Sequence, residues 1–187
     1  MTTLTFRAAT TDDIPALVAL VTSAYRGEAS RTGWTSEADL IDGERIDADA
    51  VHADLARQRS TILLAERGEH LVACAHVADD NGHGYFGMFA VDPNQQGGGL
   101  GSVVLAEAEN YVAREWGVTE MQMTVIDVRD NLIAFYERRG YARTGITKPF
   151  PYGEERFGVP RRDDLQFEVL TKRLAGSPHS AQLETTP

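Results

Sequence analysis

The sequence predicts a mixed α/β domain, and three features of the chain predict it. Segments with the period of a helix alternate with strand-like segments, and two hairpin-like turns lie in the first half. The 187 residues, 42% of them apolar, suffice for one hydrophobic core and are too few to favour two domains. We therefore expect a single domain over residues 1–175 and a polar, mobile tail over residues 176–187.

The N-terminal half predicts a helix between a strand and a hairpin. The sequence TTDDIP offers a hydroxyl to cap a helix and acidic residues for its first turn, and apolar residues follow at helical spacing. The helix signal weakens over residues 26–54, the most acidic part of the chain. Two strand-like runs joined by a polar turn around Gly68 then indicate a hairpin. We expect strands over residues 4–9, 61–66 and 71–77.

The C-terminal half predicts two helices, each placed between strands. The run YFGMFAV, ended by Asp92 and Pro93, is apolar throughout and indicates a buried central strand. A long amphipathic helix follows a cluster of glycines, and Asp130 is positioned to cap a second helix that Gly140 ends. Residues 148–164 combine prolines, glycines and charges, which predicts a long loop. The expected helices cover residues 102–116 and 132–140, and the expected strands cover 85–91, 120–126, a segment from Tyr141, and 165–171.

Charge and cysteine content argue against several classes of function. The net charge of −10 disfavours a surface that binds nucleic-acid phosphates, since such a surface needs clustered lysine and arginine. Cys74, the single cysteine, lies in an apolar strand-like run, so we expect a buried thiol without a catalytic role. The chain has neither the apolar run of a membrane span nor the N-terminal pattern of a secretory signal. We expect a cytoplasmic protein without nucleic-acid or membrane partners.

The glycine-rich segment before the long helix predicts an anion site. The residues from Gly97 to Gly99, and then Gly101, let the backbone approach a ligand closely because no Cβ atom intervenes. The helix that follows presents unpaired amides and the positive end of its dipole, which suits a pyrophosphate, and Ser102 adds a hydroxyl. Neither G-x-G-x-x-G nor Gly-Lys-Ser/Thr fits here, so a dinucleotide or nucleoside triphosphate site is disfavoured. The spacing that fits is Q-x-x-G-x-G, which begins at Gln96.

Two segments resemble the motifs of one family. MFAVDPNQQGGGLGSVVL resembles the acyl-CoA pyrophosphate motif of the GNAT acetyltransferases, and NLIAFYERRGYART resembles their second signature. The resemblance covers residues 61–144 well and the two ends by element order alone. It implies a GNAT fold, in which a mixed, mostly antiparallel central sheet is flanked by helices. It also implies an N-acetyltransferase that uses acetyl-CoA and no metal; an acyl-CoA-binding regulatory module without turnover is the alternative.

The resemblance implies roles for individual residues. Backbone groups on the central strand would pair with the pantetheine arm as an added strand, and the glycine loop would hold the pyrophosphate. Asn131 would contact the pantetheine, and Arg138 or Arg139 the other phosphate. Tyr136 would protonate the departing thiolate, a task within the range of a phenol. The expected cofactor residues are Phe89, Ala90, Val91, Gln96, Gly97, Gly98, Gly99, Gly101, Ser102, Asn131 and Arg138.

The sequence offers several candidates for the general base. Some GNAT members carry a glutamate early in the central strand, and this strand has no carboxylate there. Deprotonation of the amine must come from elsewhere, directly or through water. Glu28 is the first candidate, and the others are His76, Asp79, Asp80 and His83.

The acceptor is expected to be a primary amine of a small molecule or a peptide. The resemblance puts its site between the loop after the first helix and the loop before the last strand, where Trp34, Glu37 and Tyr152 are the substrate-binding candidates. Aromatic side chains would form a wall, joined by Phe150 and Phe157, and carboxylates would attract an ammonium. An anionic acceptor would point instead to Arg45, Arg156 or Arg161. A homodimer is compatible with the sequence.

Overall fold

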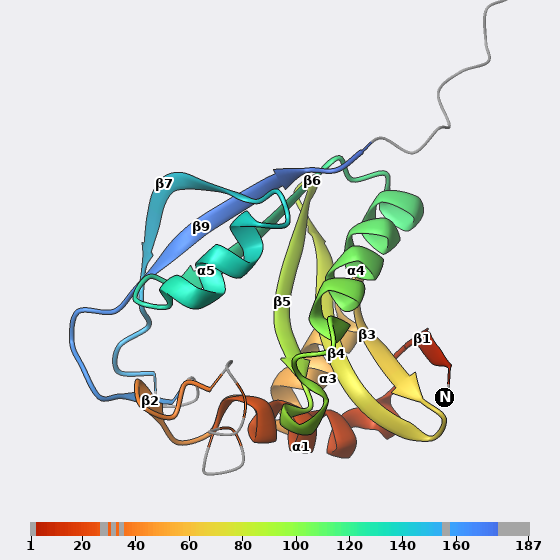
Figure 1. Cartoon of the computed structure of the whole chain (residues 1–187), viewed down its shortest axis with the longest axis horizontal. Helices are drawn as coiled ribbons and strands as arrows, with labels where there is room; N and C mark the ends of the chain where they lie inside the picture. The colour runs from red at the N-terminus through yellow and green to blue at the C-terminus, as the bar shows by residue number, and fades with distance from the viewer. Residues whose placement is uncertain (1–2, 27–29, 31–32, 34–35, 155–157, 176–187) are drawn as a thin grey trace, which may run out of the picture.

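Alternating apolar residues build a seven-stranded sheet in the computed structural model, which describes residues 3–26, 30, 33, 36–154 and 158–175. The strand order is β1-β3-β4-β5-β6-β9-β7, and each neighbouring pair is antiparallel except β5 and β6 (Figure 1). The strands are β1 (Leu4–Ala8), β3 (Ser60–Arg67), β4 (His70–Asp80), β5 (His83–Val91), β6 (Glu120–Ile126), β7 (Ala142–Pro149) and β9 (Gln166–Arg173). The sheet is therefore mixed and mostly antiparallel, as the resemblance implies.

Helices cover both faces of this sheet. They are α1 (Ile14–Tyr25), α3 (Ala48–Ala56), α4 (Leu100–Trp116) and α5 (Asp130–Glu137). Leu64 of β3 belongs to the core under α1 and α3, whereas Leu63 belongs to the core under α4 and α5. Successive residues serve different cores because side chains alternate across a strand. None of the described helices combines the length and the apolar character needed to cross a membrane.

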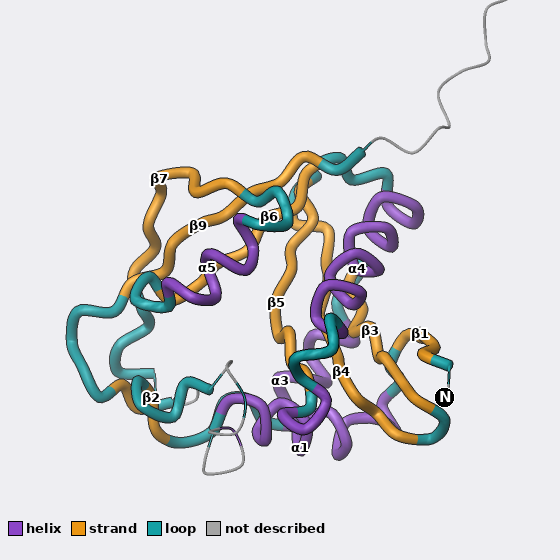
Figure 2. The backbone as a smooth tube through the Cα atoms, in the orientation of Figure 1, coloured by secondary structure: helices purple, strands orange, loops and turns teal. Residues whose placement is uncertain are grey.

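The strands β5 and β6 pair briefly and then diverge. Gly84 pairs with Met121 and Tyr85 with Gln122, and no later residue of β5 pairs with β6 in the described part of the chain. A β-bulge shifts the register between β4 and β5, and Met88 has a φ of 42° there. Such a bulge bends a strand and increases its twist. One edge of β5 is consequently left open beyond the short pairing, as Figure 2 shows.

Most elements lie where the sequence predicts them, because their signals are local. β6 covers the predicted residues 120–126, and the hairpin of β3 and β4 extends the predicted strands by a few residues. α4 begins at Leu100, two residues before the predicted start. Asp130 was expected as the cap of α5, but Arg129 takes the cap position and Asp130 lies in the first turn. A carboxylate in the first turn still suits the helix dipole.

Three short elements lie outside the prediction. In α3 one residue, Val51, is fully buried, so the helix has little apolar periodicity, although Asp47 caps it by accepting the Ala50 amide at 2.7 Å. The segments expected as loops contain β2 (Ile41–Asp42) and β8 (Val159–Pro160), which pair with each other. Such two-residue strands depend on a distant partner and leave no periodic signal. The predicted tail over 176–187 lies outside the described residues.

Candidate functional site

Two cavities share Phe89 of β5 as a lining residue. The split cavity, of about 510 Å³, is lined mainly by β5 residues 83–89 and β6 residues 122–126. The loop cavity, of about 460 Å³, is lined by the glycine loop and one side of α5. Among the described residues, Phe89 lines both. The loop cavity brings together nine of the eleven residues expected at the cofactor; Ala90 and Gly98 do not line it.

The glycine loop leaves an open cradle at the N-terminus of α4. Gly97 and Gly99 have φ values of 89° and 79°, which favour glycine. A Cβ atom on Gly97, Gly98 or Gly99 would meet nothing within 4 Å. The amides of Gly99, Leu100 and Gly101 find no hydrogen-bond acceptor among the described residues. An empty cradle with free amides at the positive end of a helix dipole fits a pyrophosphate.

Arg139 forms the opposite wall of the loop cavity. Its Nε donates to Oγ of Ser102 at 2.9 Å, and its Nη1 donates to the carbonyl oxygen of Phe135 at 2.7 Å. The guanidinium also stacks on the Phe135 ring, 3.5 Å from the centroid. Burial and the charge of Arg138 lower the pKa of Arg139. A phosphate in the cavity would offset this repulsion, so both arginines are placed to bind one.

The register of β5 decides which backbone groups face the open edge. The amide of Asp92 donates to the carbonyl of Val72 on β4. Because the direction of backbone groups alternates along a strand, Ala90 also faces β4, while Val91 faces the open side. Phe89 lies in the bulge, where this alternation is interrupted. The resemblance implies pairing with pantetheine for all three residues, and the register favours Val91 over Ala90 for it.

Side chains already occupy the carbonyl groups on this edge. The Tyr25 hydroxyl donates to the carbonyl of Phe89, and Nε2 of Gln96 donates to the carbonyl of Val91 at 3.1 Å. Gln96, expected at the pyrophosphate, thus contacts the strand edge. The amide of Val91 is the group on this edge left to pair with a ligand.

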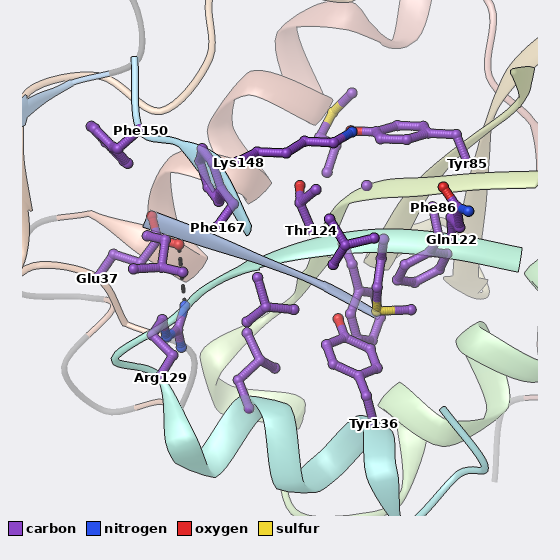
Figure 3. Close-up of a pocket in the computed structure, with 18 of the residues that line it drawn as sticks. Glu37, Tyr85, Phe86, Gln122, Thr124, Arg129, Tyr136, Lys148, Phe150 and Phe167 are labelled. Carbon is purple, nitrogen blue, oxygen red and sulfur yellow. Dashed lines mark hydrogen bonds and ion pairs between the residues drawn. The ribbon is translucent and has the colours of Figure 1, made fainter. Parts of the chain in front are cut away.

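Tyr136 reaches from α5 into the split cavity (Figure 3). It is 4% exposed, and its ring lies edge-on to Phe86 and Tyr141, with centroids 6.3 and 5.8 Å away. Its hydroxyl forms no hydrogen bond with another described residue. Burial, with a smaller effect of Tyr25, raises the pKa of Tyr136 well above its ordinary value. The phenol therefore stays protonated at neutral pH and can donate to a group that enters the cavity.

Three arginines surround the carboxylate of Glu37 in the split cavity. Nη1 of Arg26 donates to Oε2 at 2.6 Å, Nη1 of Arg129 donates to Oε1 at 3.2 Å, and Nε of Arg45 lies 3.8 Å from Oε2. Figure 3 shows the Arg129 contact. Burial alone would raise the pKa of Glu37, but the arginines hold it below its usual value. The carboxylate expected to attract an ammonium is thus a counterion shared by three guanidinium groups.

The sequence also matches the model of a known protein family. The model of the Acetyltransferase (GNAT) family matches residues 22–141, a segment that runs from α1 past α5. The chain belongs to the GNAT acetyltransferase family. This family uses acetyl-CoA, which agrees with the anion cradle of the loop cavity.

Several solved structures share the fold of this GNAT acetyltransferase. The ribosomal-protein-S18-alanine N-acetyltransferase of Escherichia coli has a TM-score of 0.69 at 15% identity, over 97% of this chain and 100% of that one. The ribosomal-protein-alanine N-acetyltransferase of Brucella melitensis has 0.66 at 24%, over 91% and 99%. The PaiA N-acetyltransferase of Thermoplasma acidophilum, solved with coenzyme A, has 0.63 at 14%, over 91% and 99%. No curated protein matches the sequence.

In this GNAT acetyltransferase, two of the candidate bases line the split cavity. Asp80 and His83 lie at its rim, with side chains 60% and 52% exposed. Asp79 is instead held in the turn, where it accepts the Gly82 amide at 2.7 Å and pairs with Arg59 at 2.6 Å. Asp80 and His83 are therefore better placed than Asp79 to take a proton from an amine.

The other titratable candidates lie away from the cavity or outside the described residues. His76 of β4 is buried, and its Nε2 lies 2.8 Å from Oγ of Ser60. Burial lowers the pKa of His76 to about 4. Burial raises the pKa of Cys74 to about 12, consistent with an inert thiol. Glu28 lies outside the described residues. No group of three metal-ligating side chains occurs in the described part of the chain.

The aromatic residues expected around the acceptor have different positions. Phe150 lines the split cavity. Tyr152 does not line it; the Tyr152 hydroxyl accepts the Leu165 amide at 2.6 Å, and its ring packs 5.1 Å from that of Phe150. Tyr152 thus orders the loop that carries Phe150. Trp34 and Phe157 lie outside the described residues.

Sequence patterns do not indicate Arg26 or Arg129 as site residues. Arg26 follows the last residue of α1 and Arg129 precedes α5, where a charge is commonly solvated. The residue that brings them together, Glu37, is 92 positions from Arg129, and no local pattern carries that information. Of the arginines named for an anionic acceptor, Arg45 lines the cavity, Arg161 pairs with Asp42, and Arg156 lies outside the described residues.

Proposed function

We propose that this protein transfers the acetyl group of acetyl-CoA to a primary amine of a small molecule or peptide, by direct attack of the amine on the thioester. The observation that carries the proposal is that Phe89 lines both cavities, which makes it the place where they would join. One cavity has a pyrophosphate cradle and the other has a buried phenol. The thioester and the amine, held in the two cavities, would come together beside Phe89 in a fixed orientation, which favours the reaction between them.

The loop cavity suits the phosphates and the arm of the cofactor. Residues 97–102 would hold the pyrophosphate, and Arg138 and Arg139 a further phosphate. The amide of Val91 would pair with the pantetheine, and Asn131 lies beside it in the first turn of α5. When bound, acetyl-CoA supplies an acetyl group activated as a thioester.

The reaction forms a C–N bond, breaks a C–S bond and moves two protons. The amine nitrogen attacks the thioester carbon and loses a proton, while the sulfur leaves and gains one. Tyr136 donates the proton to the sulfur, and solvent then restores the phenol. The raised pKa of Tyr136 keeps that proton in place until the sulfur carries negative charge.

The proton from the amine passes to a group at the mouth of the split cavity. Asp80 and His83 are the described candidates; they lie at the opposite end of β5 from Phe89, so each would act through a chain of waters. Glu28 stays the first candidate from the sequence. Replacing each one separately and comparing the pH profiles of kcat/KM would assign the role.

The names of the neighbours support a peptide amine as one class of acceptor. The Escherichia coli and Brucella melitensis proteins are by name N-acetyltransferases of a ribosomal-protein alanine. Enclosure of the split cavity between two strands supports a small amine equally well. A cytoplasmic location and a homodimer stay predictions of the sequence.

The alternative is a module that binds acyl-CoA without turnover. Tyr136 in the split cavity favours an enzyme, since a binding module has no need of a proton donor there. Calorimetric titration with acetyl-CoA, ATP and NAD, followed by a thiol assay for CoA release with a panel of amines, tests both ideas. We expect acetyl-CoA to bind and ATP and NAD not to bind. We also expect CoA release with at least one amine. Binding without release from any amine would support the module, and no binding would contradict both.

A further inference from the structure

Arg26 lines the split cavity and has an unused hydrogen-bonding edge. Its side chain is 5% exposed, and its Nη1 donates to Glu37. Its Nε and Nη2 are buried and find no hydrogen-bond partner in the described part of the chain. Buried donors without a partner are rare, because they give up their bonds to water and gain none in return. Both nitrogens lack accessible surface and Nη2 lies beside Gly158, so a ligand in the cavity would meet them only after the guanidinium turns.

The unused edge has the shape that binds a carboxylate. Nε and Nη2 lie on one edge of the planar guanidinium, and their N–H bonds are placed to meet two oxygens. Arg161 uses the same two nitrogens to hold Asp42, with Nε 2.8 Å from Oδ2 and Nη2 2.6 Å from Oδ1. Arg26 presents this fork without a carboxylate on it.

The charges in the split cavity favour a second anion. Three arginines surround the one carboxylate of Glu37, and the side chains of Arg26 and Arg129 are nearly buried. Among the described residues of the lining, four are basic and two are acidic. Desolvated charge without a counterion is unfavourable, and the single carboxylate of Glu37 balances only part of the charge of the three arginines around it. The side chain of Arg45 is 31% exposed and marks the side from which an anion can enter.

We propose that the acceptor amine also carries a carboxylate, and that Arg26, Arg45 and Arg129 bind it. This rests on the acetyl transfer proposed above and specifies its substrate: an amino acid, or a peptide with an acidic side chain near its amine. Figure 3 shows Glu37 and Arg129 at one end of the cavity lining and Phe86 and Tyr85 at the other. An acceptor with its carboxylate at the arginines can extend its amine toward the junction at Phe89.

The test compares acceptors that differ only in the carboxylate. The standard L-amino acids are assayed for CoA release beside their carboxamides. C-terminally amidated tripeptides with Glu or Gln at the second position form the peptide arm. We expect kcat/KM to be about a hundredfold higher for the carboxylate member of one arm, as for loss of a charged hydrogen-bonded pair. The arm that shows the preference identifies the source of the carboxylate.

Two variants link the preference to the arginines. Arg26→Lys keeps the charge and removes the fork, and should reduce the acid-to-amide ratio of kcat/KM to less than about tenfold. Arg45→Gln, at the more exposed position, should lower the ratio with less risk to folding. Arg161→Lys is the matched control, since Arg161 uses the same fork outside the cavity, and it should leave the ratio unchanged. Acetyl-CoA affinity, measured for each variant, reports whether the fold is intact.

The outcomes separate this inference from the proposed function. Equal rates for acids and amides in both arms would overturn the carboxylate site and leave the acetyltransferase standing. A preference that survives in both cavity variants would assign the arginines to structure alone and overturn it too. Absence of CoA release with every probe would overturn the proposed function and the inference together.

Discussion

At the scale of single residues, the proposed turnover rests most directly on Tyr136. Two tyrosine rings lie side by side in this region, 5.8 Å apart, and their hydroxyls differ in surroundings. The Tyr141 hydroxyl donates to Glu109 at 2.9 Å, whereas the Tyr136 hydroxyl has no such partner among the described residues and its ring lines the split cavity. The pair provides an internal comparison of a bonded and a free phenol.

Tyr136→Phe is expected to lower kcat about a hundredfold, the usual scale for one acid or base group, without changing the affinity for acetyl-CoA. Tyr141→Phe removes an equivalent hydroxyl outside the cavity and should leave kcat within about twofold. Steady-state CoA release and calorimetry measure the two quantities. A Tyr136→Phe enzyme with the turnover of the original would reduce this residue to a packing role.

The glycines that flank α4 allow a second matched test. Gly99 and Gly117 cap the two ends of the helix with φ values of 79° and 66°, and a Cβ on either would meet no atom within 4 Å. Alanine at either position strains the backbone to a similar degree. Gly99→Ala should weaken acetyl-CoA binding at least tenfold, because its methyl group occupies the cradle. If Gly117→Ala weakens binding as much, the loss comes from strain in α4 and the cradle is not the cofactor site.

At the scale of elements, β5 organises the site. Its bulge and its short pairing with β6 leave an open edge, and its side chains line both cavities. One position on this strand is unusually constrained. A Cβ atom on Gly87 would lie 2.1 Å from Oη of Tyr85, so the ring of Tyr85 occupies the space that a side chain would need.

Gly87→Ala is expected to push the Tyr85 ring into the split cavity. The KM for the acceptor should rise about tenfold or more while acetyl-CoA affinity changes little, because Gly87 does not line the loop cavity. In a Tyr85→Ala background the same substitution should have no further effect on KM. A loss that is equal in both backgrounds would place its cause elsewhere on the strand.

Local signals explain what the sequence could predict of these elements and of the site. The glycine loop and the Tyr136 helix are each contiguous in sequence, so the loop predicts an anion site and the resemblance of both segments to family motifs predicts the cofactor site and the proton donor. The cluster of Arg26, Glu37 and Arg129 is assembled from three segments, and its members are ordinary loop charges until the fold brings them together. For the same reason α3, which buries a single residue fully, left too weak an apolar pattern to be predicted.

At the scale of the whole molecule, the net charge of −10 does not describe the cavities. An acidic chain would favour cationic partners over its surface as a whole. Among the described residues, the split cavity is nevertheless lined by more basic than acidic side chains, and the loop cavity carries Arg138 and Arg139. The local field at the site is therefore opposite in sign to the average, as suits an anionic cofactor.

Stability should depend on pH through His76. The neighbours of this side chain are Ser60, the ring of Tyr85, and Asp54, whose Oδ2 lies 3.5 Å from Nδ1. Burial, together with the positive charge of Arg57, lowers the pKa of His76 to about 4. An unfolded histidine titrates near 6.5, so below that pH the unfolded state binds a proton that the folded state does not. The free energy of unfolding should therefore fall as pH drops from about 6.5 to about 4.

The expected loss is on the order of 3 kcal/mol over that window, at 1.36 kcal/mol per pKa unit. Urea unfolding at pH 7 and pH 5 measures most of it. His76→Gln should remove most of the pH dependence, and His83→Gln, at a half-exposed position, should keep it. Identical pH dependence in both variants would assign the acid sensitivity to other groups.

The sharing of one phenylalanine by two separately lined cavities has a kinetic consequence. If donor and acceptor occupy the two cavities at the same time, as proposed, we expect catalysis to proceed through a ternary complex. The thiol of Cys74 is buried and its pKa is raised, so it is not available to form an acetyl-enzyme intermediate. Double-reciprocal plots of initial rate against one substrate, at several fixed levels of the other, should intersect. Parallel lines would indicate a ping-pong mechanism, in which the acetyl group is bound covalently to the protein before the amine binds.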